Sequence, residues 1–67
     1  MATNSEIYRA ADLLIKEFGE LAAVGAVVKA DQFEREGNVE GHAVWIRILK
    51  AVEELLADDL PKGTQIN

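Results

Sequence analysis

The sequence predicts an all-α protein, a small three-helix bundle in which the second and third helices form a tight antiparallel hairpin. Apolar residues recur every three to four positions in three segments, which is the period of an amphipathic helix. Gly19 and the Gly37–Asn38 pair separate these segments, and such short connections make consecutive helices neighbours. The chain has 67 residues, which is enough for one domain, residues 1–67, around one core.

The first helix is expected over residues 5–18. Thr3 and Glu6 have the spacing of a capping box, in which each side chain bonds to the backbone of the other residue. Gly19 follows the apolar pattern directly and can adopt the left-handed conformation that closes a helix. The periodic apolar positions are Ile7, Ala10, Ala11, Leu14, Ile15 and Phe18.

The second helix is expected over residues 20–36, an alanine-rich segment with several valines. A strand over residues 21–28 is the alternative. A helix is favoured because the apolar residues continue to Phe33 without alternation, and because the chain has no second strand to pair with. Gly37 can close this helix while Asn38 caps the next one.

The third helix is expected over residues 39–57. It carries two adjacent apolar rows. Trp45 in one of them is expected to pack in the core, and the alternative is that it anchors an interface. Gly41 near its start is expected to allow the first turn to approach the preceding loop closely. Pro61 disfavours helical geometry at Leu60, so residues 58–67 are expected to form a mobile polar tail. The rows are Val44, Ile48, Val52 and Leu55, and Trp45, Leu49, Val52 and Leu56.

Composition argues against several classes of partner. The net charge is -5, whereas nucleic-acid binders need clustered Lys and Arg to neutralise phosphates, and anionic membranes attract basic segments. No apolar run reaches the roughly 18–20 residues of a membrane span. Residues 1–6 lack the pattern of a signal peptide, so a cytoplasmic location is expected. The chain has no cysteine, which excludes disulfides.

The sequence contains no recognisable catalytic, cofactor or metal site. His42 is the only histidine and Ser5 the only serine, so neither a nucleophile–base pair nor a set of zinc ligands can be assembled. The acidic residues lack the spacing of a calcium loop and are expected to be solvated surface charges. We therefore expect a protein that is not an enzyme, with no cofactor and no small-molecule substrate.

Apolar residues exceed what three helices can bury. Leu13 and Ile46 lie within the polar arcs of the first and third helices, and the second helix, with Val24 and Val27, is apolar nearly all round. Scattered apolar residues are common on surfaces, which is the simpler explanation. We favour a contact surface formed by Leu13, Val24, Val27 and Ile46, because two-fold homodimers are the commonest assembly.

The expected function is a small cytoplasmic protein-interaction module that binds a second copy of itself or another protein. The alternative is a nucleic-acid-related regulator, either a helix-turn-helix-like protein that contacts DNA or an acidic mimic of DNA. The net negative charge makes direct contact with nucleic acid the weaker version of this alternative.

Several short sequence segments occur in the same order as in a known group of proteins. They are Ala30–Asp31, Gly37–Asn38–Val39–Glu40–Gly41, Ala43–Val44–Trp45, Arg47–Ile48–Leu49 and Ala51–Val52–Glu53–Glu54–Leu55. With the segment from Tyr8 to Gly19, the chain resembles a group of short uncharacterised helical proteins from alphaproteobacteria, a family with a domain of unknown function, over most of residues 7–56. The resemblance implies a bacterial pedigree and no activity. The sequence departs from the group at Ile46, where the group is basic, and at Asn38, where Asp is frequent, so an interface through Ile46 need not be general to the group.

Overall fold

The computed structural model describes residues 3–58, and every regular element within them is helical. The elements are α1 (Asn4–Phe18), a 3₁₀ turn η1 (Gly19–Leu21), α2 (Ala22–Arg35) and α3 (Val39–Asp58). The prediction of an all-α chain is confirmed. The prediction of three separate helices needs a correction, because η1 keeps the chain helical from residue 4 to residue 35 and only residues 36–38 interrupt it before α3.

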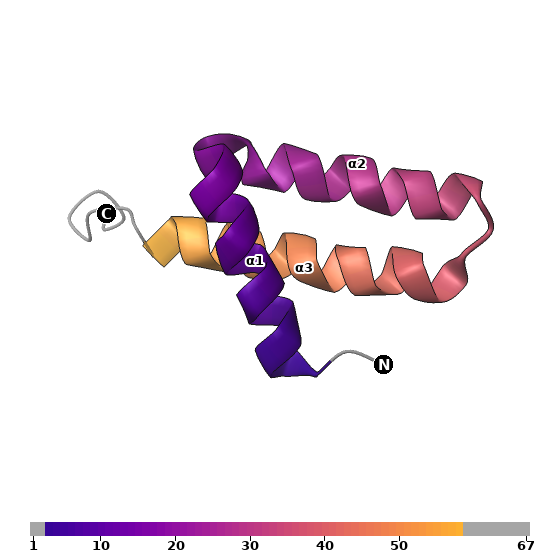
Figure 1. Ribbon diagram of the computed structural model, residues 1–67, viewed down its shortest axis with the longest axis horizontal. Helices are drawn as coiled ribbons and strands as arrows, with labels where there is room; N and C mark the ends of the chain where they lie inside the picture. Colours follow the sequence, from indigo (N-terminus) through magenta and orange to yellow (C-terminus); the bar gives the residue numbers. More distant parts are fainter. Residues whose placement is uncertain (1–2, 59–67) are drawn as a thin grey trace, which may run out of the picture.

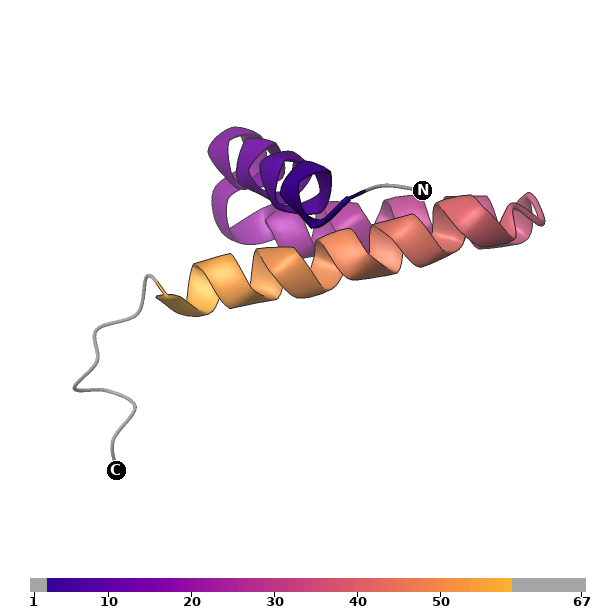
Figure 2. The same cartoon turned by 90° about the horizontal axis from the view of Figure 1, so that it is seen from below.

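Two of the helices form a pair that α1 covers on one side. α2 and α3 lie side by side and run in opposite directions, and α1 crosses them near the start of α2 (Figure 1). Figure 2 shows α1 on one side of the α2–α3 pair, with no helix of the described chain on the other side. Within residues 3–58, one broad face of the pair therefore has no covering element.

The ends of α1 follow from local chemistry. The Glu6 N–H donates to Thr3 Oγ1 and the Thr3 N–H donates to Glu6 Oε1, both at 3.2 Å, which confirms the predicted capping box. Gly19 ends α1 with φ of 59°, and its N–H donates to the carbonyl of Ile15. The chain then tightens into η1 instead of opening into a loop, so α2 begins at Ala22 and not at residue 20 as predicted.

The connection between α2 and α3 is closed by backbone hydrogen bonds. The Gly37 N–H donates to the Glu34 carbonyl at 3.0 Å and the Asn38 N–H to the Phe33 carbonyl at 2.9 Å, the pattern of a Schellman motif. Gly37 has φ of 78°, which an L side chain rarely adopts. Asn38 Oδ1 accepts from the Gly41 N–H at 2.8 Å. The predicted roles of Gly37 and Asn38 are confirmed.

The C-terminal boundary differs slightly from the prediction. Asp58 belongs to α3, whereas the sequence placed it at the start of a tail. The rest of that predicted tail, with Pro61, lies outside the described residues.

The core is small and rich in alanine. Among the described residues, Val52 is the only bulky side chain that is completely buried, and Trp45 is half-buried at the edge of the core. Alanines spaced four residues apart on α2 face α3, because their small side chains let the two helices approach closely. The buried residues are Ile7, Ala11, Ala22, Ala26, Ala30, Ile48, Ala51 and Val52.

Gly41 is explained by a side chain and not by the loop that the sequence suggested. A Cβ atom added at Gly41 would lie 2.6 Å from Cδ1 and 2.9 Å from Cγ of Phe33. The Phe33 ring from the last turns of α2 therefore rests on the first turn of α3, and only glycine leaves room for it there.

Candidate interaction surface

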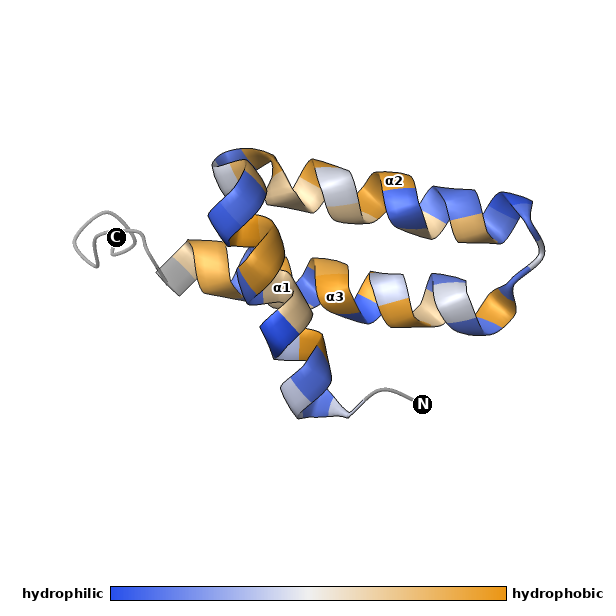
Figure 3. Ribbon diagram, in the orientation of Figure 1, coloured by the Kyte–Doolittle hydropathy of each residue, from blue (hydrophilic) through white to orange (hydrophobic). Residues whose placement is uncertain are grey.

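Three alanines of α2 are buried, whereas its three valines, together with Leu21 of the preceding η1 turn, are exposed. Ala22, Ala26 and Ala30 are buried. Leu21 is 64% exposed, Val24 56%, Val27 49% and Val28 58%. Because residues three and four apart are neighbours on a helix, these four side chains form one continuous surface, which we name the α2 outer face. Figure 3 shows hydrophobic residues on the side of α2 that points away from α3.

The predicted interface residue Leu13 lies apart from this surface. It is 56% exposed and follows the buried Ala11 by two residues, which turns it about 200° around the axis of α1. Since Ala11 and Ile7 face the α2–α3 pair, Leu13 points away from the pair. The structure therefore does not bring Leu13 together with Val24 and Val27.

Val27 and Ile46 are brought to the same level of the α2–α3 pair. The His42 Nδ1 atom lies within hydrogen-bonding distance, 3.0 Å, of the Ala30 carbonyl oxygen, and this contact sets the register of the two helices. Because the two helices are antiparallel, a residue three positions before Ala30 on α2 lies at about the same height along the pair as a residue three or four positions after His42 on α3. Val27 and Ile46 are therefore level with one another across the pair.

Ile46 is half-buried, whereas the sequence placed it within an exposed polar arc. The reason is that Ile46 follows His42 by one helical turn, and His42 is held against α2. Ile46 therefore lies on the same side of α3 as His42. It is not in the middle of the surface that faces solvent.

Polar contacts hold α1 on the opposite side of α3. The Arg47 Nη2 atom donates to Asn4 Oδ1 at 2.9 Å, and the Tyr8 hydroxyl donates to the Glu54 carboxylate. This hydrogen bond is the main cause that raises the pKa of Tyr8 above its ordinary value of 10.0, with smaller contributions from desolvation and from the Glu54 charge. Leu49 follows Arg47 by two residues and thus lies about 200° around α3 from it.

These relations define a second apolar surface. Val27, Ile46 and Leu49 lie on the face of the α2–α3 pair that α1 does not cover, and we name it the α1-free face. Val27 is shared between the two surfaces. Of the four residues predicted as an interface, Val24 therefore lies on the α2 outer face, Ile46 on the α1-free face and Val27 on both. Leu13 lies on neither.

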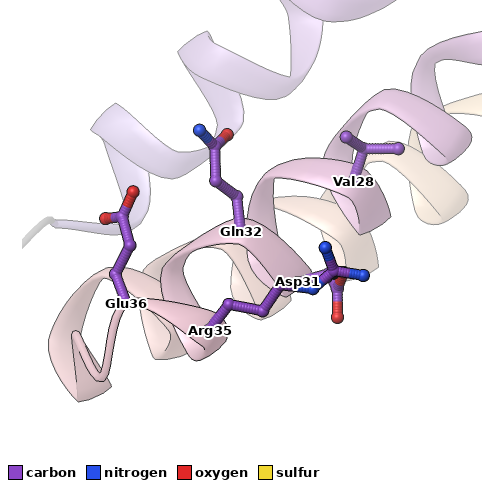
Figure 4. Close-up of a pocket in the computed structure, with 5 residues that line it drawn as sticks. All are labelled: Val28, Asp31, Gln32, Arg35 and Glu36. Carbon is purple, nitrogen blue, oxygen red and sulfur yellow. Dashed lines mark ion pairs between the residues drawn. The ribbon is translucent and has the colours of Figure 1, made fainter.

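A shallow hollow of about 550 Å³ lies on the outer side of α2 (Figure 4). Its walls are successive turns of one helix, and an ion pair of 3.0 Å joins Arg35 Nε to Asp31 Oδ2 within it. The two charged side chains are 80% and 50% exposed, so water screens their attraction. The hollow is a part of the helix surface between side chains and does not enclose a ligand. It is lined by Val28, Asp31, Gln32, Arg35 and Glu36.

Metal-binding and membrane-spanning features are both missing from the part of the chain that the structure describes. Within it, no three His, Asp or Glu side chains gather in a way that could hold a metal ion. None of the helices in residues 3–58 combines the length and the apolar character that crossing a membrane requires.

Comparisons with models of known protein families, with curated proteins and with solved structures found no match to this chain. The resemblance to short alphaproteobacterial proteins therefore stays a prediction.

Proposed function

We propose that this chain is a small, cytoplasmic, non-enzymatic protein-interaction module that works as a homodimer. In this proposal the α2–α3 pair is a helical hairpin, α1 completes a three-helix bundle on one side, and a second copy of the chain completes it on the other. The observation that carries the proposal is the α1-free face, where Val27 is 49% exposed, Ile46 and Leu49 are half-buried, and no helix within residues 3–58 covers them.

The energetics favour a partner for these side chains. Burying a Val or Leu side chain completely is worth about 1.5–3 kcal/mol, so covering the exposed half of Val27 on the α1-free face would contribute on the order of 1 kcal/mol. A chain of this size obtains only a few kcal/mol from its own core. The core of this chain is rich in alanine, which contributes little apolar area, so the stabilisation from its own core is especially small.

The proposal is tested by measuring the mass of the chain in solution by light scattering at micromolar concentration. We expect twice the 7.3 kDa of one chain. Ile46→Glu places a charge on the α1-free face and is expected to give the mass of a single chain while the circular dichroism remains helical. Ser5→Glu is the matched control, because it adds the same charge at an exposed position of α1 and should leave the dimer intact.

A wild-type mass of one chain at tens of micromolar would reject the homodimer. A dimer that Ile46→Glu does not weaken would show that the contact lies elsewhere on the molecule.

A further inference from the structure

α3 carries a second row of side chains, four apolar and two polar, besides the row that packs in the core. Its six positions are separated alternately by three and four residues, which is the spacing of the a and d positions of a coiled coil. Ile48, Ala51 and Val52 belong to the core and are not among them. We name this row the α3 seam. Its residues are Val39, His42, Ile46, Leu49, Glu53 and Leu56.

The seam lies where a second helix could reach it. It contains Ile46 and Leu49 of the α1-free face, and its first residue, Val39, is 78% exposed. His42, Ile46, Leu49 and Leu56 are each half-buried, and Glu53 is exposed. Three of the six, Ile46, Leu49 and Leu56, are half-buried apolar side chains at coiled-coil spacing, and knobs-into-holes packing against a second helix would complete their burial.

We propose that a second copy of this chain binds along the α3 seam, with the two α3 helices antiparallel about a two-fold axis between Ile46 and Leu49. This inference deepens the proposed homodimer and rests on it. In this arrangement Ile46 packs against the partner's Leu49, and Val39 packs against the partner's Leu56. The two remaining seam positions also pair, with His42 opposite the partner's Glu53.

Avoidance of like charges selects the antiparallel direction. Parallel helices would place Glu53 against its own copy, and like charges that face one another are destabilising. The antiparallel direction instead pairs each carboxylate with an imidazole. Because the Ala30 carbonyl accepts from Nδ1–H of His42, Nε2 can donate to the partner's Glu53 carboxylate only in the imidazolium form, in which both ring nitrogens carry a proton.

The size of the face suits a second copy. α3 has 20 residues and is therefore about 30 Å long. α2 has 14 residues and is about 21 Å long. With each helix about 10 Å wide, the footprint is about 500 Å² per copy and about 1,000 Å² for a dimer. This total is about the smallest area expected of a biological interface, roughly 1,000 Å².

Spin-label distances test the direction of the helices. The chain has no cysteine, so Lys50→Cys and Ala57→Cys each introduce a single labelling site at an exposed position of α3. The antiparallel axis predicts separations between equivalent backbone positions of about 12 Å at residue 50 and about 30 Å at residue 57, from the helical rise and the spacing of packed helices. Parallel helices predict about 10 Å at both positions.

Charge exchange tests the pairing of His42 with Glu53. His42→Glu alone places two carboxylates together, and Glu53→Lys alone removes the acceptor. Each single variant is expected to weaken the dimer by about tenfold or more, which corresponds to about 1.4 kcal/mol. The double variant, His42→Glu with Glu53→Lys, again places opposite charges together across the axis and should recover most of the wild-type affinity. The two positions are eleven residues apart on one helix, about 16 Å, so recovery cannot arise within one chain.

The outcomes separate this inference from the proposed function. A monomeric wild type would overturn both. A wild-type dimer with similar label separations at residues 50 and 57, or with a double variant no tighter than the weaker single variant, would overturn the α3 seam and leave the homodimer standing.

Discussion

The contact between Gly41 and the Phe33 ring makes a sharp prediction for Gly41→Ala. The new Cβ atom would lie 2.6 Å from Cδ1 of Phe33, well inside van der Waals contact. The nearest atoms belong to the ring itself, including Cγ at 2.9 Å, so the whole half-buried side chain would have to move. α2 and α3 would then separate or the ring would leave its place.

Two effects of opposite sign determine the size of the change. Replacing glycine by alanine inside a helix stabilises it by up to about 1 kcal/mol. Overpacking of a fitted contact destabilises by about 1–3 kcal/mol. The expected net result is a loss of about 1 kcal/mol in the free energy of unfolding, which lowers the melting temperature by roughly 4–8 °C in a domain of this size.

Gly25→Ala is the matched control for this experiment. Gly25 lies within α2, and nothing lies within 4 Å of a Cβ atom built there. The helix-forming effect of alanine is therefore unopposed, and the melting temperature should rise by a few degrees. Thermal unfolding followed by circular dichroism at one fixed protein concentration measures both variants.

The interpretation would be refuted if both substitutions raised the melting temperature equally. A double variant gives an independent check. In a Phe33→Ala background the ring is absent, so Gly41→Ala should become stabilising by up to about 1 kcal/mol.

Three further predictions concern single contacts. Asn38→Ala removes the acceptor for the Gly41 N–H and should lower the free energy of unfolding by about 1 kcal/mol, whereas Asn38→Asp should preserve it; equal urea midpoints for the two variants would contradict the cap. Tyr8 is the only tyrosine, so an ultraviolet titration should find its pKa above 10.0, and Glu54→Ala should bring it back. Because the folded state holds the Tyr8 proton more tightly than the unfolded state, the hydrogen bond contributes fully to the free energy of unfolding below pH of about 10. That contribution should be lost as the pH rises through the raised pKa, and Tyr8→Phe should not show this loss. Trp45→Ala should lower the free energy of unfolding by about 2 kcal/mol, because Trp45 is half-buried and a fully buried tryptophan would lose roughly 3–5 kcal/mol. A urea midpoint equal to that of the wild type would show that Trp45 does not pack against the core.

The helix ends could be predicted because their signals are local. The hydroxyl of Thr3, the carboxylate of Glu6 and the amide of Asn38 act on backbone groups within three residues of themselves. Gly37 acts through its own φ angle. Such signals do not depend on what the rest of the chain does, so the sequence suffices to predict them.

The buried side of α2 could not be predicted from the sequence. Both sides of this helix are apolar, and the choice between them depends on how closely α3 approaches. The structure turns Ala22, Ala26 and Ala30 inward because small side chains permit a close pair. The η1 turn escaped prediction for a related reason, since Gly19 marks the end of α1 without specifying the path that follows.

The helical-wheel position of Ile46 and its coiled-coil spacing lead to different predictions. Its place on a helical wheel is polar, which led to the expectation of an exposed side chain, whereas it is half-buried. The coiled-coil spacing that links Ile46 with Leu49 and Leu56 was present in the sequence. It was overlooked because the sequence placed Leu49 and Leu56 in the predicted core row, whereas our proposal assigns both to the α3 seam as well.

The central claim is that two chains fold as one unit because each leaves apolar surface for the other to cover. The most direct test is the concentration dependence of thermal unfolding. If unfolding separates two chains, the melting temperature should rise by up to about 5 °C for each tenfold increase in protein concentration, from the entropy of unfolding of two chains of this length. A melting temperature that stays constant over a hundredfold range of concentration would show that a single chain is stable by itself and would contradict the account.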